Sequence, residues 1–367
     1  MNVSLYGLSL SRDFRYGYFS SSMNDVRMAG CRFEKLFGGI LIGSFNNLKV
    51  IKTSFNGILS NCFTFESVFK NDLTAFSSIE KTLVFSDTSF HDFQYGSFSY
   101  LVYISDSSIS LLFMKSSIYN IKCQSDTHKL IFASSGFRIS IHHVCIFSCS
   151  LISPSIGVNS HVTNIPYCSL NYTYEFNITH IGSSYAGGRL KYTFYNNNGT
   201  NLVSTGNWRS AFGIVSTNSG TIGGYCFFKS NSGQYIGHIE TGNTNQLSNF
   251  YIISNTATIS LFDFRTTPTI LTFVDSIFWN NSRILFASGT AVASSKLTIT
   301  NSVFDSTFIT SQAQLSLINT ILSDEYTVSL NIDTHICEPT NEILVCGTRY
   351  LLNAERRFLL LFSFLIS

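Results

Sequence analysis

The sequence predicts an all-β fold: a single-stranded right-handed parallel β-helix, or β-solenoid, with coils of roughly 21–29 residues. Three observations predict it. The composition is typical of β-proteins, a short motif places a small residue two positions before an aromatic one, and Asn often follows that aromatic residue. The chain has 367 residues, which is long for one compact domain but ordinary for a solenoid that grows by adding coils.

The composition favours strands and argues against nucleic acid as a partner. Aromatic residues make up 15% of the chain and charged residues only 12%, about half the usual share. The net charge is +2, with no basic run, so we expect no binding of nucleic acid driven by charge. No segment shows helical periodicity over more than two turns.

The spacing of the motif is the main evidence for coils. The step between aromatic residues is 21 residues from Phe69 to Phe90, 29 to Tyr119 and 28 to Phe147. Between Phe33 and Phe69 the phase stays open, because Phe45 and Phe55 compete for the same position. The motif occurs at Cys31–Phe33, Ser67–Phe69, Thr88–Phe90, Ser117–Tyr119, Cys145–Phe147, Thr193–Tyr195, Cys226–Phe228, Ser276–Phe278 and Ser302–Phe304.

Asn residues mark a turn one to three residues after most of these aromatics. Asn tolerates the left-handed backbone conformation, and equivalent Asn side chains of stacked coils can form a ladder. The Asn residues at this position are Asn71, Asn120, Asn196, Asn231, Asn255 and Asn281.

The first and third residues of the motif share one side of a strand, and we expect both to point inward. Ser, Thr and Cys alternate at the first position, including Cys31, Cys145 and Cys226, which indicates selection for size rather than chemistry. An antiparallel sandwich or propeller is the alternative, but hairpin turns such as Asn56-Gly57 and Asn198-Gly199 are too few for it.

The chain divides into four expected parts. Residues 1–30 are an N-terminal cap, 31–325 the β-helix, and 326–350 a C-terminal cap. Residues 351–367 are a basic and then apolar tail. Its apolar part, Phe358 to Ser367, is shorter than the ~20 residues of a membrane span, so it is either a truncated membrane anchor or a terminal strand or helix.

The repeated coil resembles the pectin-lyase-like right-handed β-helix superfamily. More narrowly, it looks like uncharacterised β-helix repeat surface proteins of parasitic protists. The resemblance covers roughly residues 31 to 325 and implies the architecture. Many proteins of this architecture act on polysaccharides, yet the paired Asp, Gly-His-Gly and Arg-x-Lys signatures are not present as a set. Gly237-His238-Ile239 is the nearest match.

The candidate catalytic residues are Glu66 and Asp87. Each lies three residues before a motif aromatic, so adjacent coils would place the two carboxylates about one strand spacing apart. An acid at this position is more often a turn residue, and the next coil has Ser116 there. We therefore expect no catalytic site, and no cofactor.

The cluster His142, His143, Cys145 and Cys149 has residue types that bind metals. On a straight strand Cys145 and Cys149 would lie about 13 Å apart, whereas zinc ligands converge within about 2.3 Å of one ion. We expect no metal site.

Two further features bear on location. Cys337 and Cys346 flank a turn and form a possible disulfide in an oxidising compartment; the alternative is two unpaired thiols. The sequons at Asn171, Asn177, Asn198 and Asn280 permit glycosylation, although Asn280 also falls at the Asn turn.

The expected function is that of a non-catalytic surface or secreted protein in structure, adhesion or partner binding, with glycans or cell-surface proteins as partners. The N-terminus has no clear signal peptide. The alternative is a carbohydrate-active enzyme, a polysaccharide lyase or glycoside hydrolase, with an atypical site.

Overall fold

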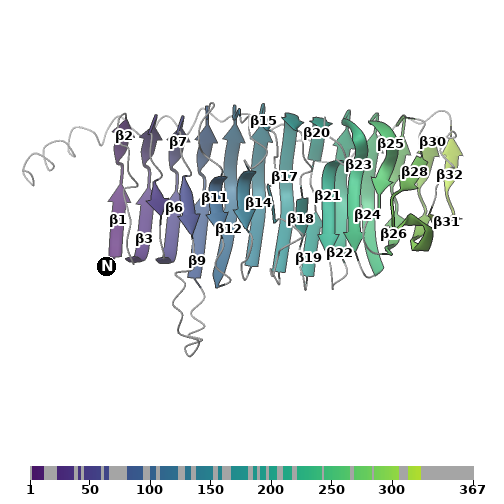
Figure 1. Ribbon diagram of the computed structural model, residues 1–367, viewed down its shortest axis with the longest axis horizontal. Helices are drawn as coiled ribbons and strands as arrows, with labels where there is room; N and C mark the ends of the chain where they lie inside the picture. Colours follow the sequence, from purple (N-terminus) through teal and green to yellow (C-terminus); the bar gives the residue numbers. More distant parts are fainter. Residues whose placement is uncertain are drawn as a thin grey trace, which may run out of the picture.

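In the computed structural model the chain forms one long parallel β-solenoid, with coils stacked along the longest axis of the molecule (Figure 1). The structure describes residues 2–11, 23–36, 40–42, 45–58, 62–65, 81–93, 100–104, 108–122, 129–133, 138–151, 156–158, 167–180, 185–187, 191–195, 198–204, 210–216, 221–241, 244–264, 268–282, 285–305 and 313–323. The all-β parallel fold predicted from the coil motif is confirmed.

Each coil contributes strands to three faces of the solenoid. The first face holds β1 (Asn2–Tyr6), β3 (Met23–Ala29), β6 (Phe45–Ile51), β9 (Lys81–Ser86), β19 (Lys191–Tyr195), β26 (Ile270–Val274), β29 (Lys296–Thr300) and β31 (Gln314–Ile318). The second face holds β2 (Ser9–Ser11), β4 (Arg32–Glu34), β7 (Ser54–Asn56), β10 (Ser89–His91), β20 (Asn198–Ser204), β27 (Ile277–Trp279), β30 (Val303–Asp305) and β32 (Ile321–Ser323). β15 (Ser150–Leu151) follows the second-face corner at Ser148.

Other strands run through both of these faces or form the third. Those that span the first and second faces are β12 (Ile109–Tyr119), β14 (Arg138–Phe147), β17 (Tyr167–His180), β22 (Thr221–Lys229) and β24 (Thr244–Ile253). The third face holds β5 (Leu41–Ile42), β8 (Phe63–Phe65), β11 (Tyr100–Ile104), β13 (Lys129–Ala133), β16 (Ile156–Val158), β18 (Tyr185–Gly187), β21 (Ser210–Ser216), β23 (Ser232–Thr241), β25 (Thr256–Asp263) and β28 (Leu285–Ser288), and one 3-10 turn (Val292–Ser294) follows β28.

The register of the second face fixes which residues are equivalent. Phe33 pairs with Phe55, Phe55 with Phe90, Phe90 with Ile118 and Ile118 with Ile146, all in parallel strands. The mean spacing along the solenoid is about 26 residues, within the predicted range. The phase left open by the sequence is thereby settled, because Phe55 is the equivalent of both Phe33 and Phe90.

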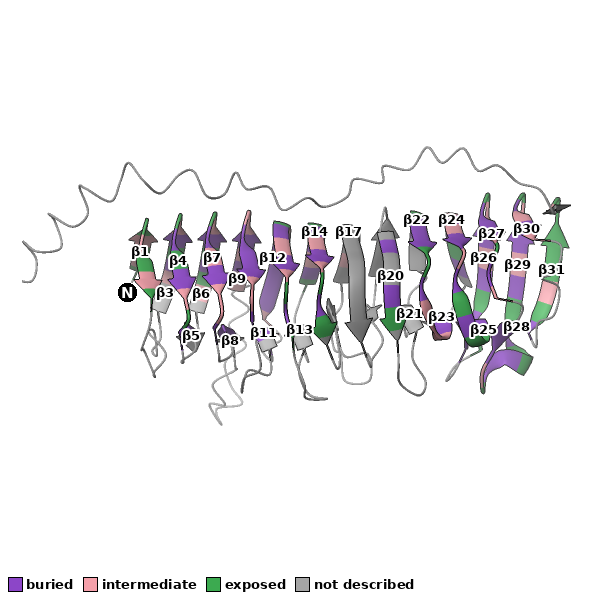
Figure 2. Cartoon of the chain, turned by 90° about the horizontal axis from the view of Figure 1, so that it is seen from above, coloured by how far each residue is buried: buried purple, intermediate pink, exposed green. Residues whose placement is uncertain are grey.

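The core is a column of these inward side chains. Phe55 stacks on Phe33 with ring centroids 5.2 Å apart and on Phe90 with centroids 4.8 Å apart. All three rings are fully buried. Such pairs contribute about 0.5–1.5 kcal/mol beyond the burial of their area. Buried residues follow one another from coil to coil along the second-face strands (Figure 2).

Where the small residue of the motif is Ser, its hydroxyl also accepts a backbone hydrogen bond, which the sequence did not predict. Ser276 Oγ accepts the backbone N–H of Phe250 at 3.1 Å, and Ser302 Oγ accepts that of Ser276 at 3.1 Å. The hydroxyl therefore satisfies a buried backbone donor of the preceding coil. The interpretation that this position selects for size alone is wrong where it holds Ser.

In two coils the motif is shifted by one residue from the predicted frame. Ile118 and Ile146 point inward and are buried, whereas Tyr119 and Phe147 are half-buried on the outer side. Cys145 accordingly lies outward, half-buried, and is disulfide-bonded, so the expectation that it fills the same inward position as Cys31 and Cys226 is wrong.

Each coil turns at residues in the left-handed conformation, and two columns of them run along the solenoid. Lys52, Asp87 and Lys115 follow the first face, with φ of 48°, 52° and 47°. Asp92 and Asn120 follow the second face, with φ of 59° and 53°. Gly and Asn adopt this conformation most readily, so Lys and Asp at the corners carry a small local strain.

The residue after the second corner is buried, and in the C-terminal half it is Asn. Asn231, Asn255 and Asn281 form the predicted ladder: Asn231 N–H donates to Asn255 Oδ1 at 2.9 Å, and Asn255 N–H donates to Asn281 Oδ1 at 3.0 Å. In earlier coils the same position holds apolar residues, for example Phe93 and Ile121. Asn120 lies one residue earlier, exposed at the corner, and is not part of this ladder.

The boundaries expected at residues 30, 325 and 350 stay predictions. Strands β1 and β3 pair in the parallel ladder from Asn2–Asp25 to Tyr6–Ala29, so parallel pairing between coils occurs within residues 1–30. Such pairing occurs because apolar residues there follow the coil period. The expected C-terminal cap and tail, 326–367, lie outside the described residues.

Candidate functional site

The outer side of the second face carries a chain of polar contacts near the N-terminal end. Alternation along β7 turns Phe55 into the core and Ser54 outward, and alternation along β10 does the same for Phe90 and His91. Because Phe55 and Phe90 are register partners, Ser54 lies diagonally across from His91. The buried Phe column thus positions the two polar side chains.

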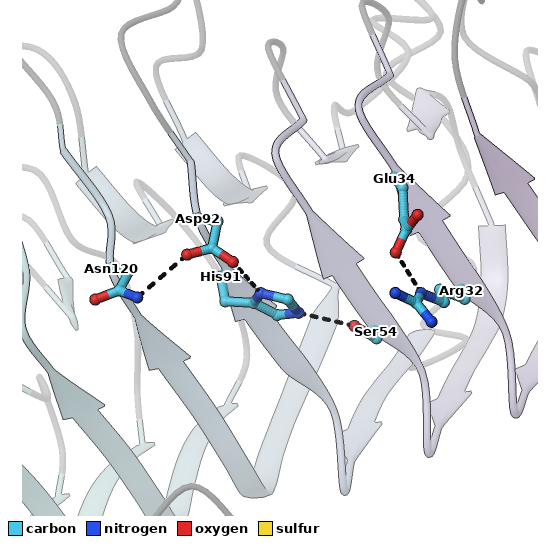
Figure 3. Close-up of polar contacts among 6 residues, drawn as sticks. All are labelled: Arg32, Glu34, Ser54, His91, Asp92 and Asn120. Carbon is cyan, nitrogen blue, oxygen red and sulfur yellow. Dashed lines mark hydrogen bonds and ion pairs between the residues drawn. The ribbon is translucent and has the colours of Figure 1, made fainter. Parts of the chain in front are cut away.

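Ser54, His91 and Asp92 form a continuous hydrogen-bonded chain (Figure 3). Ser54 Oγ lies 3.0 Å from His91 Nε2, and His91 Nδ1 lies 2.8 Å from Asp92 Oδ2. The His91 side chain is 15% exposed and that of Asp92 45% exposed. A hydroxyl, an imidazole and a carboxylate therefore follow one another in the order used by Ser–His–Asp hydrolases.

The corner after β10 brings Asp92 into this chain. Its left-handed backbone turns the carboxylate back toward the preceding His91. Asn120, at the same corner of the next coil, donates from Nδ2 to Asp92 Oδ1 at 3.2 Å. One carboxylate oxygen is thus held by the imidazole and the other by an amide, which fixes its orientation.

An aromatic stack holds the imidazole from the other side. His91 stacks on Tyr119 with centroids 4.8 Å apart and planes 3° apart, and Tyr119 stacks on Phe147 at 4.8 Å and 7°. Burial raises the pKa of the Tyr119 phenol, and the negative charge of Asp92 raises it further. The stack restricts rotation of the His91 ring.

Arg32 lies on the other side of Ser54. Arg32 is the register partner of Ser54 one coil before it, and its Nε is paired with Glu34. Figure 3 shows the guanidinium beside Ser54, away from His91. A cation, a hydroxyl, an imidazole and a carboxylate thus lie in a row across three coils.

The predicted carboxylate pair is not supported by the register. Glu66 lies outside the described residues. Asp87 occupies the corner before β10, where Ser86 Oγ donates to its Oδ2 at 2.7 Å, and the corner residues of the neighbouring coils are Lys52 and Lys115. The argument that residue 66 is the coil equivalent of Asp87 is wrong, because Phe55 and not Phe69 precedes Phe90 in the column.

The residues considered for a metal site point in different directions. His143 is exposed at a corner with φ of 53°, Cys149 is buried in the core, and Cys145 is disulfide-bonded. Burial lowers the pKa of His142, and the neighbouring His143 lowers it further. Among the described residues no group of three or more His, Cys, Asp and Glu could hold a metal ion.

His238, the nearest match to a hydrolase signature, is inside the solenoid. Its Nδ1 lies 3.0 Å from Asp263 Oδ2, with side chains 3% and 0% exposed. Asp263 is its register partner in the next coil. This pair is buried and offers no access to a polymer substrate.

The remaining predicted residues are placed as follows. Cys337 and Cys346 lie outside the described residues, and Asn171, Asn177 and Asn198 lie in β17 and β20. Asn280 is exposed at a second-face corner, where it donates to Ser254 Oγ at 3.2 Å, so the ladder residue there is Asn281 instead. In the part of the chain that the structure describes, no helix is long and apolar enough to cross a membrane.

The Ser54–His91 contact was missed because the residues are 37 positions apart, well beyond the mean coil spacing. The sequence signal was the His91-Asp92 pair directly after a motif aromatic, together with the correct phase of Phe55. Comparison of the chain with protein-family models, with curated proteins and with solved structures finds no match.

Proposed function

We propose that the protein binds a glycan along the outer side of the second face, from β4 to β14, as a surface or secreted scaffold. The observation that carries this proposal is the regular row of outward polar groups around the His91–Tyr119–Phe147 stack. Parallel coils repeat at about 4.8 Å, so the outward polar side chains of successive coils, such as Ser54, His91 and Asn120, are spaced at about that interval along the face. A polymer with regularly spaced hydroxyl groups matches such a row.

The chemistry of the face favours a glycan over other polymers. Its charges are mixed, with Arg32 paired to Glu34 and Asp92 bonded to His91, and the chain carries a net charge of only +2. Nucleic acid needs a concentration of positive charge. An added peptide strand needs open backbone donors at a sheet edge, whereas Ser54 and Ser89 donate their N–H groups within the ladder.

The proposal includes a relationship to known β-helix proteins. The coil motif supports membership of the pectin-lyase-like superfamily, and a likeness to β-helix surface proteins of parasitic protists supports a place at the cell surface. A protein partner and membrane association through Phe358 to Ser367 are the other outcomes to test.

The test is a glycan array followed by calorimetry with the purified full chain. Binding should fall at least tenfold in a Tyr119→Ala, Asn120→Ala double variant. The matched control is Tyr6→Ala, since Tyr6 is 62% exposed but lies on the first face of the first described coil. An array without any bound glycan, or equal loss in the control variant, would contradict the proposal.

A further inference from the structure

We infer that Ser54, His91 and Asp92 form an acyl-transfer site that hydrolyses small carboxylic esters. This inference goes beyond the proposed glycan binding and does not depend on it. It rests on the order and identity of the contacting atoms, on the support around the imidazole, and on the position of Arg32.

The atom pairing determines which nitrogen acts as the base. Asp92 as a carboxylate can only accept, so Nδ1 of neutral His91 carries the proton and donates it to Asp92 Oδ2 over 2.8 Å. Nε2 then has a lone pair, and it accepts the hydroxyl hydrogen of Ser54 over 3.0 Å. This is the tautomer that a serine nucleophile requires.

The surroundings hold this geometry without a bound substrate. The imidazole is stacked on Tyr119, and Asp92 Oδ1 accepts a hydrogen bond from Asn120 Nδ2. Ser54 is fixed by the strand, since the next residue, Phe55, is locked in the core column. Preorganised contacts of this kind lower the entropic cost of reaching the reactive arrangement.

The backbone N–H of Ser54 is not the oxyanion donor. The backbone N–H of Ser54 donates to Cys31 O at 2.9 Å within the ladder and cannot turn toward a substrate. Arg32, one coil away at the same register position, carries N–H donors and a positive charge beside Ser54 (Figure 3). It can stabilise the negative oxygen of a tetrahedral intermediate.

The reaction has two balanced steps. Ser54 Oγ attacks the ester carbonyl carbon while Nε2 takes its proton; the bond to the alkoxy oxygen breaks, and the alcohol leaves with that proton. Water then attacks the acyl carbon of Ser54 while Nε2 takes a proton from it, and the carboxylic acid leaves as Ser54 regains a proton. No oxidant, metal or cofactor is consumed.

The open position of the site selects esters over amides. The side chains of Arg32 and Asp92 are 53% and 45% exposed, so water screens the stabilisation of the intermediate. An alkoxide leaves more readily than an amide nitrogen and needs less of that stabilisation.

The test uses the full-length protein, p-nitrophenyl acetate and a fluorophosphonate probe. We expect turnover above the buffer rate, a loss of at least about 100-fold in Ser54→Ala and in His91→Asn, and labelling of Ser54 located by mass spectrometry. Ser117→Ala is the matched control, because Ser117 occupies the same outward column two coils on. It should keep the wild-type rate.

The Asp92→Asn variant distinguishes a loss of His91 orientation from a loss of folding. Asn occupies the same corner in the next coil with nearly the same φ, so the backbone should be unchanged, while the carboxylate charge is lost and the single amide oxygen cannot accept from both His91 Nδ1 and Asn120 Nδ2. The rate should fall while the melting temperature stays. Wild-type turnover equal to that of Ser54→Ala, labelling elsewhere than Ser54, or equal hydrolysis of p-nitroacetanilide would overturn the inference. Labelling of the wild-type protein tests the inference even if a variant fails to fold.

Discussion

Asn255 donates to Asn281 Oδ1 from both its backbone N–H and its side-chain amide, each over 3.0 Å. The same amide also donates to Phe228 O at 3.0 Å. One buried side chain thereby joins three successive coils. We expect Asn255→Leu to lower the free energy of unfolding by about 2–4 kcal/mol, because it leaves buried backbone groups unpaired.

The control for this change is Asn280→Gly, at an exposed corner of the neighbouring coil whose left-handed backbone glycine also adopts. It should cost less than about 1 kcal/mol. Urea unfolding followed by circular dichroism measures both. An Asn255→Leu variant as stable as the wild type would show that apolar packing, as at Phe93 and Ile121, serves equally well here.

The loss of stability on substituting Phe90 in the core column should depend on the size of the new side chain. Phe90→Ala should cost about 3–5 kcal/mol, because it opens a cavity between Phe55 and Phe113. Phe90→Ile should cost less than half of that, since Ile118 fills the equivalent position in the next coil. Denaturant midpoints compare the two, and equal losses would contradict the equivalence of these positions.

The buried pair His238–Asp263 predicts strong coupling between two coils. His238→Ala should destabilise the protein by about 3–5 kcal/mol, because the Asp263 carboxylate loses a partner at 0% exposure. The double change His238→Leu, Asp263→Leu should cost much less than the sum of His238→Leu alone and Asp263→Leu alone. Additive losses in urea unfolding would show that the pair is not coupled.

We expect the alkaline titration of the Tyr119 phenol to depend on Asp92. Its pKa is raised by burial and then by Asp92, so Asp92→Asn should lower the pKa part of the way toward about 10. A phenol whose pKa is higher when folded keeps its proton longer there. Its contribution to stability is therefore present below pH 10 and is lost as the pH rises through the folded-state pKa. Ultraviolet difference titration against Tyr119→Phe isolates this residue, and an unchanged pKa in Asp92→Asn would exclude the charge effect.

Where sequence reasoning failed, the cause was the two-residue period of strands. In the coils around Ser117–Tyr119 and Cys145–Phe147 an outward aromatic stands directly beside an inward Ile, so two frames fit equally well. Only the corner position distinguishes them. The corners there are Lys115 and His143, which carry no turn signal in a sequence.

The sequence by itself determined the parallel coil, a period within roughly 21–29 residues, the inward aromatic position in most coils and the Asn ladder of the C-terminal half. These features are periodic, and residues that repeat at the coil period stack on their equivalents in the neighbouring coils. The tertiary structure alone decided that Ser54 meets His91, because their 37-residue separation reflects one long coil rather than the repeat. It also decided that Glu66 is not the coil equivalent of Asp87, since a site across coils depends on the register of each strand and not on the motif that the strands share.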